Sequence, residues 1–169
     1  MRLESGIARG FWGRAVVCSV VVAAAAYWLA RRADGPLGMF PGGPFRQESE
    51  SCHDVDWAEY TDVSEIELEL RPDAPRSITT WSVVLEGALY IPADFLTPWK
   101  RWPHEVEEDP RVRLRVGGRV FACRAMRATD AQQISRLRAS IAEKYQISAD
   151  GAAARAEVWW FRILPRVPD

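Results

Sequence analysis

The chain of 169 residues is poor in the residues that most often build metal and nucleophilic sites, with three cysteines and two histidines. No Cys-x-x-Cys or His-Glu zinc motif occurs, and His53 and His104 lack the spacing of metal ligands. The chain also lacks G-x-S-x-G and a glycine-rich phosphate loop between a strand and a helix. These absences argue against zinc enzymes, esterase-type hydrolases and P-loop nucleotide hydrolases, and we expect no metal site.

Basic residues are scarce in the first half of the chain that follows the N-terminal segment. Residues 33–99 carry 3 Lys or Arg against 13 Asp or Glu, whereas residues 100–169 carry 14 basic and 9 acidic residues. Because nucleic-acid affinity comes mainly from neutralising phosphates, this acidic part of the chain is not expected to bind nucleic acid. The basic excess after residue 100 is still enough to hold one small phosphate.

One long uncharged run lies near the N-terminus. Sixteen uncharged residues separate Arg14 from Arg31, and as a helix they would extend about 24 Å. Aromatic residues stand near both ends of the run, as they do at membrane interfaces. We predict a single transmembrane anchor over residues 1–31, with a cleaved signal peptide and a buried core helix as the alternatives.

Charges and cysteines bear on the location of the protein. Three arginines precede the uncharged run and two follow it, which slightly favours a cytoplasmic N-terminus. We therefore predict a single-pass protein of the inner (cell) membrane with an extracytoplasmic globular domain. Cys52 and Cys123 either pair in an oxidising compartment or remain free thiols.

Residues 32–51 are rich in proline and glycine and show no helical or strand period. They predict an extended linker between the anchor and a globular domain over residues 52–169. Apolar side chains are too many for a fully solvated tether, so we expect part of this linker to lie against the domain or the membrane. Gly42-Gly43 supports a ligand loop only weakly, because no strand precedes it and no helix follows.

The globular part shows the alternation that is typical of strands. In residues 64–70 apolar and acidic side chains alternate, which predicts one buried face and one solvent-exposed face. Tight hairpins are expected at Glu86-Gly87 and Gly117-Gly118. The predicted strands cover residues 64–70, 77–87, 88–92, 112–116, 119–128 and 157–164.

Two helices interrupt these strands. One covers about Trp102 to Glu108 and stops before Asp109-Pro110, and the other runs from an N-cap at Thr129 or Asp130 to Tyr145. We predict a mainly β (α+β) fold, a six-stranded antiparallel barrel with one or two helices, which leaves no sheet edge exposed. If the arginine-rich strand pairs with the glutamate-rich one, their charges fix the register.

The segment from Leu89 to Asp130 resembles the middle of the flavin-binding split-barrel superfamily, which includes pyridoxamine-phosphate oxidases and deazaflavin-dependent nitroreductases. The elements that match the family order are Tyr90, Lys100-Arg101, the predicted short helix, Asp109-Pro110 and the hairpin from Arg111 to Arg127. The resemblance covers about residues 76–130 and implies a split barrel, an FMN or deazaflavin cofactor and a homodimer. Residues 35–43 also resemble the linker of uncharacterised membrane-anchored bacterial proteins.

The needs of such a cofactor select candidate residues. A phosphate needs two or three fixed cations, often with backbone amides at a helix start, and hydroxyl groups can add donors. A flavin ring needs a flat apolar slot between aromatic faces. The candidate cofactor-binding residues are therefore Arg76, Ser77, Thr79, Trp81, Tyr90, Lys100, Arg101 and Trp102.

Each candidate also has an ordinary structural explanation. Trp81 and Tyr90 are typical core residues, and Glu105 could neutralise the basic pair. Arg76 is the only basic residue on its strand, whereas the oxidases carry several, so the cofactor could have been lost or exchanged. We predict a membrane-anchored split barrel that binds FMN or a deazaflavin as an oxidoreductase. The alternatives are a cofactor-free envelope module for binding or dimerisation, and an unrelated small β-barrel.

Overall fold

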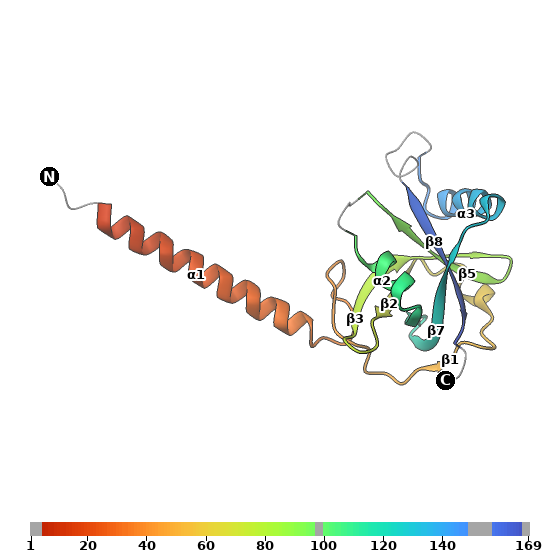
Figure 1. The fold of residues 1–169 in the computed structure, drawn as a ribbon, viewed down its shortest axis with the longest axis horizontal. Helices are drawn as coiled ribbons and strands as arrows, with labels where there is room; N and C mark the ends of the chain where they lie inside the picture. Colours follow the sequence, from red (N-terminus) through yellow and green to blue (C-terminus); the bar gives the residue numbers. More distant parts are fainter. Residues whose placement is uncertain (1–4, 97–99, 149–156, 167–169) are drawn as a thin grey trace.

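A computed structural model describes residues 5–96, 100–148 and 157–166, and of residues 5–15 it describes the backbone only. Helix α1 (Ser5–Ala30) projects away from the body that the other elements form (Figure 1). Two further helices, α2 (Trp102–Glu108) and α3 (Ala131–Lys144), and one 3-10 turn, η1 (Trp57–Tyr60), belong to that body. Helix α2 matches its predicted bounds.

The described part of the chain contains eight strands, so the prediction of six was wrong. The strands are β1 (Glu50–Ser51), β2 (Glu65–Leu70), β3 (Arg76–Trp81), β4 (Val83–Leu85), β5 (Ala88–Asp94), β6 (Arg111–Val116), β7 (Arg119–Ala128) and β8 (Val158–Pro165). Strand β1 has two residues, which is too short for an alternating pattern by which it could be predicted from sequence. Strands β3 and β4 divide one predicted strand, because the N–H of Ser82 donates to the Tyr145 hydroxyl, 3.1 Å away, and not to a neighbouring strand.

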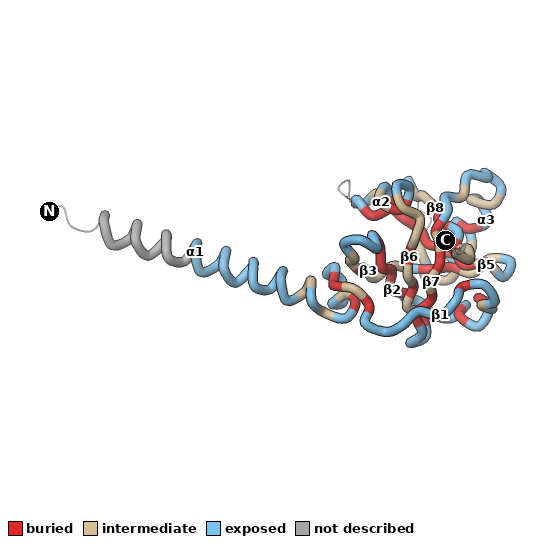
Figure 2. Tube along the Cα trace, turned by 60° about the horizontal axis from the view of Figure 1, so that its bottom comes forward, coloured by how far each residue is buried: buried red, intermediate tan, exposed pale blue. Residues whose placement is uncertain are grey.

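The predicted transmembrane helix is not supported. Its residues do form α1, and the described part of this helix is exposed along its length (Figure 2). Among the described residues, however, no helix combines the length and the apolar character that crossing a membrane requires. The uncharged run between Arg14 and Arg31 has sixteen residues. Its helical length of about 24 Å falls short of a hydrocarbon core of about 30 Å.

The strands form one curled sheet in the order β3-β2-β6-β7-β8-β5-β4, in which all neighbours are antiparallel. Strand β1 pairs with β7 in parallel. The chain passes from one outer strand, β3, directly into the other, β4, through Ser82, and β3 also contacts β5. The sheet therefore curls on itself, so that its two outer strands, β3 and β4, lie at its open seam.

Local signals placed the hairpins and the start of α3 correctly. Glu86 and Gly87 have positive φ angles of 52° and 73°, and they connect β4 to β5. Gly117 and Gly118 connect β6 to β7 in the same way. Asp130, one of the two predicted N-cap residues, does cap α3. Its carboxylate accepts a hydrogen bond of 2.7 Å from the N–H of Gln133.

The core has two parts. The larger lies inside the curled sheet, where the apolar faces of β2, β5, β6 and β7 meet under α2. The smaller lies where α3 covers the sheet, with Leu137 and Ile141 packed near Trp160. Buried segments in Figure 2 accordingly concentrate in the strands and on the inner sides of these helices.

The charged faces of β2 and β6 do pair, and they are partly covered. Glu67 lies opposite Arg115, and Glu69 lies opposite Arg113. Residues 31–47, which we call the strap, fold back over this face. The Arg113 guanidinium donates to the Glu69 carboxylate at 3.1 Å and to the backbone carbonyl of Phe45 at 3.0 Å.

The strap also covers the outer edge of β3. The backbone groups of Gly42 and Ser77 exchange two hydrogen bonds, of 2.9 and 3.2 Å. A Cβ atom on Gly42 would lie 1.7 Å from the carbonyl oxygen of Gly35, so only glycine lets the two passes of the strap cross. Much of the predicted linker therefore lies against the domain, where it protects a sheet edge.

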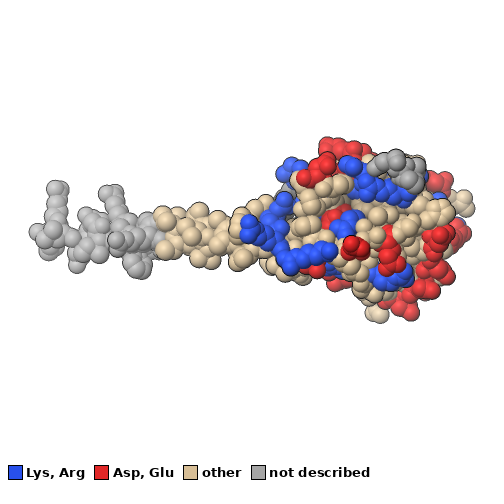
Figure 3. Space-filling view, turned by 90° about the horizontal axis from the view of Figure 1, so that it is seen from below, with Lys and Arg blue, Asp and Glu red and all other residues tan. Residues whose placement is uncertain are grey.

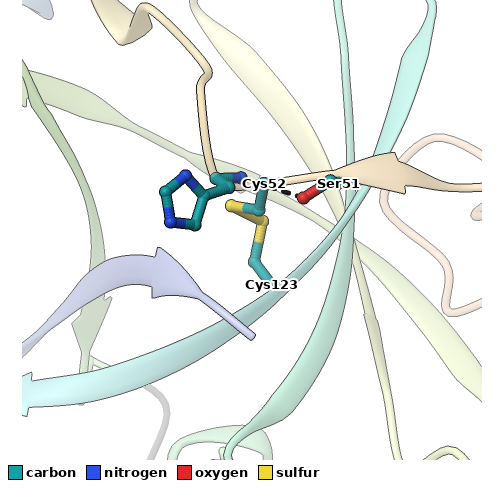
Figure 4. Close-up of a disulfide and its surroundings, with 4 residues drawn as sticks. Ser51, Cys52 and Cys123 are labelled. Carbon is teal, nitrogen blue, oxygen red and sulfur yellow. Dashed lines mark hydrogen bonds between the residues drawn. A yellow bond between two sulfur atoms is a disulfide. The ribbon is translucent and has the colours of Figure 1, made fainter. Parts of the chain in front are cut away.

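A disulfide fastens the chain just beyond the strap. Cys52 follows β1 and pairs with Cys123 on β7, and both residues are buried (Figure 4). The sequence left open whether these cysteines pair, and the structure pairs them. The bond joins residues that are 71 positions apart, so it removes much conformational freedom from the unfolded chain.

Candidate cofactor site

Six of the eight predicted cofactor residues line two neighbouring cavities beside β3 and the start of α2. Residues 76–81 of β3 and residues 100–102 lie far apart in sequence, and the curl of the sheet brings them to the same place. The two cavities share Lys100 and Trp102 as walls, together with Ile78 and Met39. We call them the basic cleft and the central cavity.

The basic cleft has a volume of about 1030 Å³ and lies between the C-terminal end of α1, the strap, β3 and α2. Basic side chains gather where α1 meets the body (Figure 3). One carboxylate, that of Glu105, also lines the cleft. An excess of cations in a concave site attracts anions and raises their local concentration. The cations in its wall are Arg31, Arg71, Arg76, Lys100 and Arg101.

Two of these cations are held by carboxylates. Arg76 donates to Glu105 at 2.7 Å, and Lys100 donates to Asp94 at 2.7 Å. Glu105 therefore neutralises Arg76 of β3 and not the Lys100-Arg101 pair that the sequence analysis considered. For Arg31, Arg71 and Arg101, no ion pair is found within the described part of the chain. The cleft thus keeps an excess of positive charge after its internal pairs are counted.

The start of α2 offers little to a phosphate. Pro103 has no N–H group, and the N–H groups of His104 and Glu105 donate to the Arg101 carbonyl at 3.1 and 3.2 Å. These two backbone amides, which could have bound a phosphate, are therefore already bonded. An anion in the cleft must be held by side chains.

The central cavity has a volume of about 430 Å³, and its wall combines two indoles and other apolar side chains with polar and charged ones, which are Glu65, Thr79, Thr80, Asp94 and Lys100. Trp81 is 42% exposed, and one of its faces stacks on Tyr145 with 4.5 Å between the ring centres and 13° between the planes. Trp102 is buried against Phe161. Two indoles in fixed positions provide the flat apolar walls that a planar ring needs.

Tyr145 is itself fixed at the end of α3. Burial raises the pKa of its phenol, whose hydroxyl donates to the backbone carbonyl of Ser82 at 3.0 Å. Burial also lowers the pKa of the neighbouring Lys144 amine, which donates to the carbonyls of Val63 and Ser82. These bonds attach α3 to the bend between β3 and β4, and they keep Tyr145 behind Trp81.

Three predicted residues have their polar groups engaged elsewhere. The Ser77 hydroxyl donates to the Gly43 carbonyl at 2.6 Å, and Thr79 donates to the Gly38 carbonyl at 2.8 Å. Tyr90 is buried in the smaller core, where its hydroxyl accepts a hydrogen bond from Gln133. Thr79 lines the central cavity through its side chain, whereas Ser77 and Tyr90 line neither cavity.

Sequence reasoning missed the strap and several charged residues of the site. Arg31 and Arg71 border the cleft, Asp94 holds Lys100, and Met39 of the strap lines both cavities. No local pattern marks these residues, because only the folded chain brings them beside β3. The abundance of apolar residues in the strap was the one signal that it would lie on the domain.

Solved structures of similar fold were found. A conserved hypothetical protein from Mycobacterium tuberculosis is 16% identical, with a TM-score of 0.50 over 72% of this chain and 87% of that one. A FAD-binding protein from Mesorhizobium loti is 17% identical, with a TM-score of 0.48, and covers 70% of this chain and 93% of its own. An F420 reductase is 12% identical, with a TM-score of 0.47, over 68% and 95%.

Searches against protein-family models and against curated proteins returned no match. The similar structures include pyridoxamine-phosphate oxidase-like, FAD-binding and F420 reductase split-barrel proteins. The similarity to the Mycobacterium tuberculosis protein, with a TM-score of 0.50, extends to the fold alone. At such low identity the similarity identifies no substrate or catalytic residue.

Proposed function

We propose that this chain is a split-barrel protein that binds a flavin or a deazaflavin beside β3 and serves as an oxidoreductase. One observation carries the proposal. A cleft with five cations opens next to a cavity with two fixed indoles, and the two share Lys100 and Trp102. Such a cofactor combines an anionic tail with a planar ring, and this arrangement offers a place for each.

The cations of the basic cleft would have two different roles in binding the cofactor. Arg101 and Arg71 would hold the anionic part, because neither has an ion pair within the described residues. Arg76 and Lys100 keep their orientation through Glu105 and Asp94, which also offset their charge, so they would add hydrogen-bond donors at fixed positions. When bound, such a cofactor supplies hydride or electron transfer, and the protein supplies orientation and electrostatics.

The aromatic walls would position the ring. Tyr145 supports Trp81 from behind, so the indole cannot rotate away from the cavity without losing that stacking. Trp102 is held against Phe161. A ring between such walls would also be shielded from water on its apolar faces.

The test is a titration of the full chain with FMN and, separately, with a deazaflavin, followed by absorption and fluorescence. We expect saturable binding of one of them. A charged hydrogen bond to phosphate is worth about 1.5 to 3 kcal/mol, so Arg101→Gln should weaken binding at least about tenfold. Arg136→Gln is the matched control, because Arg136 lies on α3 and is paired with Glu86. Failure to bind either compound, or equal binding by both variants, would refute the proposal.

A cofactor-free binding module is the second candidate. Arg76 and Lys100 already have carboxylate partners, so part of the basic cleft is stable without any ligand. This candidate predicts a colourless, folded protein whose stability does not change when FMN or a deazaflavin is added. A homodimer, which the family resemblance implies, remains a prediction for either function.

We also propose that the domain functions in an oxidising compartment. The support is the disulfide between Cys52 and Cys123, since such bonds are rare where thiols are kept reduced. Protein isolated from cells under acid quench should show no alkylation of these two cysteines before reduction. Full alkylation before reduction would contradict this location.

A further inference from the structure

A third cavity lies under α3 and shares Trp81 as a wall with the central cavity. It has a volume of about 400 Å³, within the range of small-molecule sites. We call it the apolar chamber, since most of its wall consists of apolar side chains from α3, β5 and β8. The wall includes Leu96, Ile141, Ala142, Ile147, Val158 and Trp160.

Two charged residues, Asp94 and Arg138, border this chamber, and they differ in whether their side chains have hydrogen-bond partners. Asp94 accepts hydrogen bonds from Lys100 at 2.7 Å and from the N–H of Leu96 at 3.3 Å. Arg138 is exposed, and no ion pair or hydrogen bond of its side chain is found within the described residues. The charge at the rim that is available to a ligand is therefore the positive charge of Arg138, and it favours an anionic group on that ligand.

The chamber and the central cavity share Trp81, Pro92 and Asp94 as walls. A molecule in the chamber would thus be separated from a ring in the central cavity by this shared wall. Because Tyr145 holds Trp81 in place, this separation is set by the fold.

We propose that the apolar chamber binds a small apolar carboxylate, with its hydrocarbon body among the α3 and β8 side chains and its carboxylate at Arg138. This compound class would be the substrate of the proposed oxidoreductase, and that role rests on the proposed function. The binding site itself depends only on the chamber and on Arg138. Shape selects an apolar body, and charge selects an anion over a neutral or cationic analogue.

The test measures binding of 2-naphthoate to the full chain without cofactor, by calorimetry, beside its neutral analogue 2-naphthalenemethanol. We expect naphthoate to bind saturably and at least about tenfold more tightly than the alcohol, as one charge-assisted contact allows. Arg138→Gln should remove this preference. Arg136→Gln, two residues away on α3 and already paired with Glu86, should keep it.

A second pair of variants tests the location. Ala142→Leu fills the chamber and should weaken naphthoate binding at least about tenfold. Ala131→Leu, at the exposed start of α3, should leave binding unchanged. If Ala142→Leu lowers the melting temperature strongly, Ala139→Leu at the exposed rim of the chamber replaces it. Unchanged binding in the chamber variant, or in Arg138→Gln, would overturn the proposal.

Titrations with FMN and with a deazaflavin on the same samples separate this inference from the proposed function. If naphthoate binds as described but neither cofactor does, the proposed function fails and the binding site stands. If naphthoate displaces a bound cofactor competitively, the chamber belongs to the cofactor site and the inference fails. Simultaneous binding of naphthoate and cofactor supports both.

Discussion

The strap and helix α3 both cover the curled sheet, but different forces hold them. The strap is fastened by directed polar contacts: Asp34 pairs with Arg115, the N–H of Phe45 donates to Glu69, and the Phe45 carbonyl accepts from Arg113. Helix α3 is fastened mainly by apolar packing of Leu137 and Ile141. Directed contacts fix each group in place, whereas apolar packing leaves the chamber beside Ile141. The polar cover therefore shapes the basic cleft, and the apolar cover shapes the chamber.

Removing one buried charge from the strap contacts should have the largest effect. Glu69→Ala leaves the Arg113 guanidinium and the N–H of Phe45 without their carboxylate. Loss of one partner from a buried pair costs about 3 to 5 kcal/mol of unfolding free energy, and urea unfolding of the full chain measures it. Glu65→Ala, at the exposed start of the same strand, is the control. If the two variants lose equal stability, the strap is not fastened as described.

Shortening a buried apolar side chain of α3 should lower the free energy of unfolding by less. Leu137 is completely buried, and Leu137→Ala should lower the free energy of unfolding by about 3 kcal/mol. Because apolar burial does not depend on charge, high salt should not reduce this loss, whereas it should weaken the exposed ion pairs of the strap. Ser135→Ala, an exposed position on the same helix, should be nearly neutral. A loss that disappears in high salt would contradict the contrast.

Acid should give the smallest and most selective effect. The pKa of Asp34 is lowered, chiefly by the hydrogen bond from the N–H of Arg46 and also by Arg115. Because the folded pKa lies below the unfolded one, this carboxylate stabilises the protein above about pH 4, and the contribution is lost as pH falls through the folded pKa. Asp34→Asn should flatten that part of the stability profile, and Glu48→Gln should not. Identical acid profiles for wild type and Asp34→Asn would refute the role.

The features that could be predicted from sequence depend on neighbouring residues. The alternation in β2, the positive φ angles at Glu86-Gly87 and the cap at Asp130 act over a few positions, so local patterns reveal them. The split of one predicted strand at Ser82 could not be found in this way, because a tyrosine 63 positions later causes it.

The candidate site shows the same division. The basic pair and Trp81 could be selected from chemistry alone, and they do lie at neighbouring cavities. Ser77 and Tyr90 could not be judged, because their hydroxyl groups are bonded to Gly43 and Gln133, which are distant in sequence. Residue type indicates what a side chain can do, whereas the fold decides what it is already doing.

The sequence by itself determined the strand-rich class, the hairpins, the bounds of α2 and the split-barrel resemblance, since these follow from short-range periodicity, turn chemistry and motif order. The tertiary structure decided the disulfide, the folding back of the strap, the pairing of Arg76 with Glu105 and the chamber under α3. Each of these depends on groups dozens of residues apart. Their meeting is set by the curl of the sheet, which no local pattern contains.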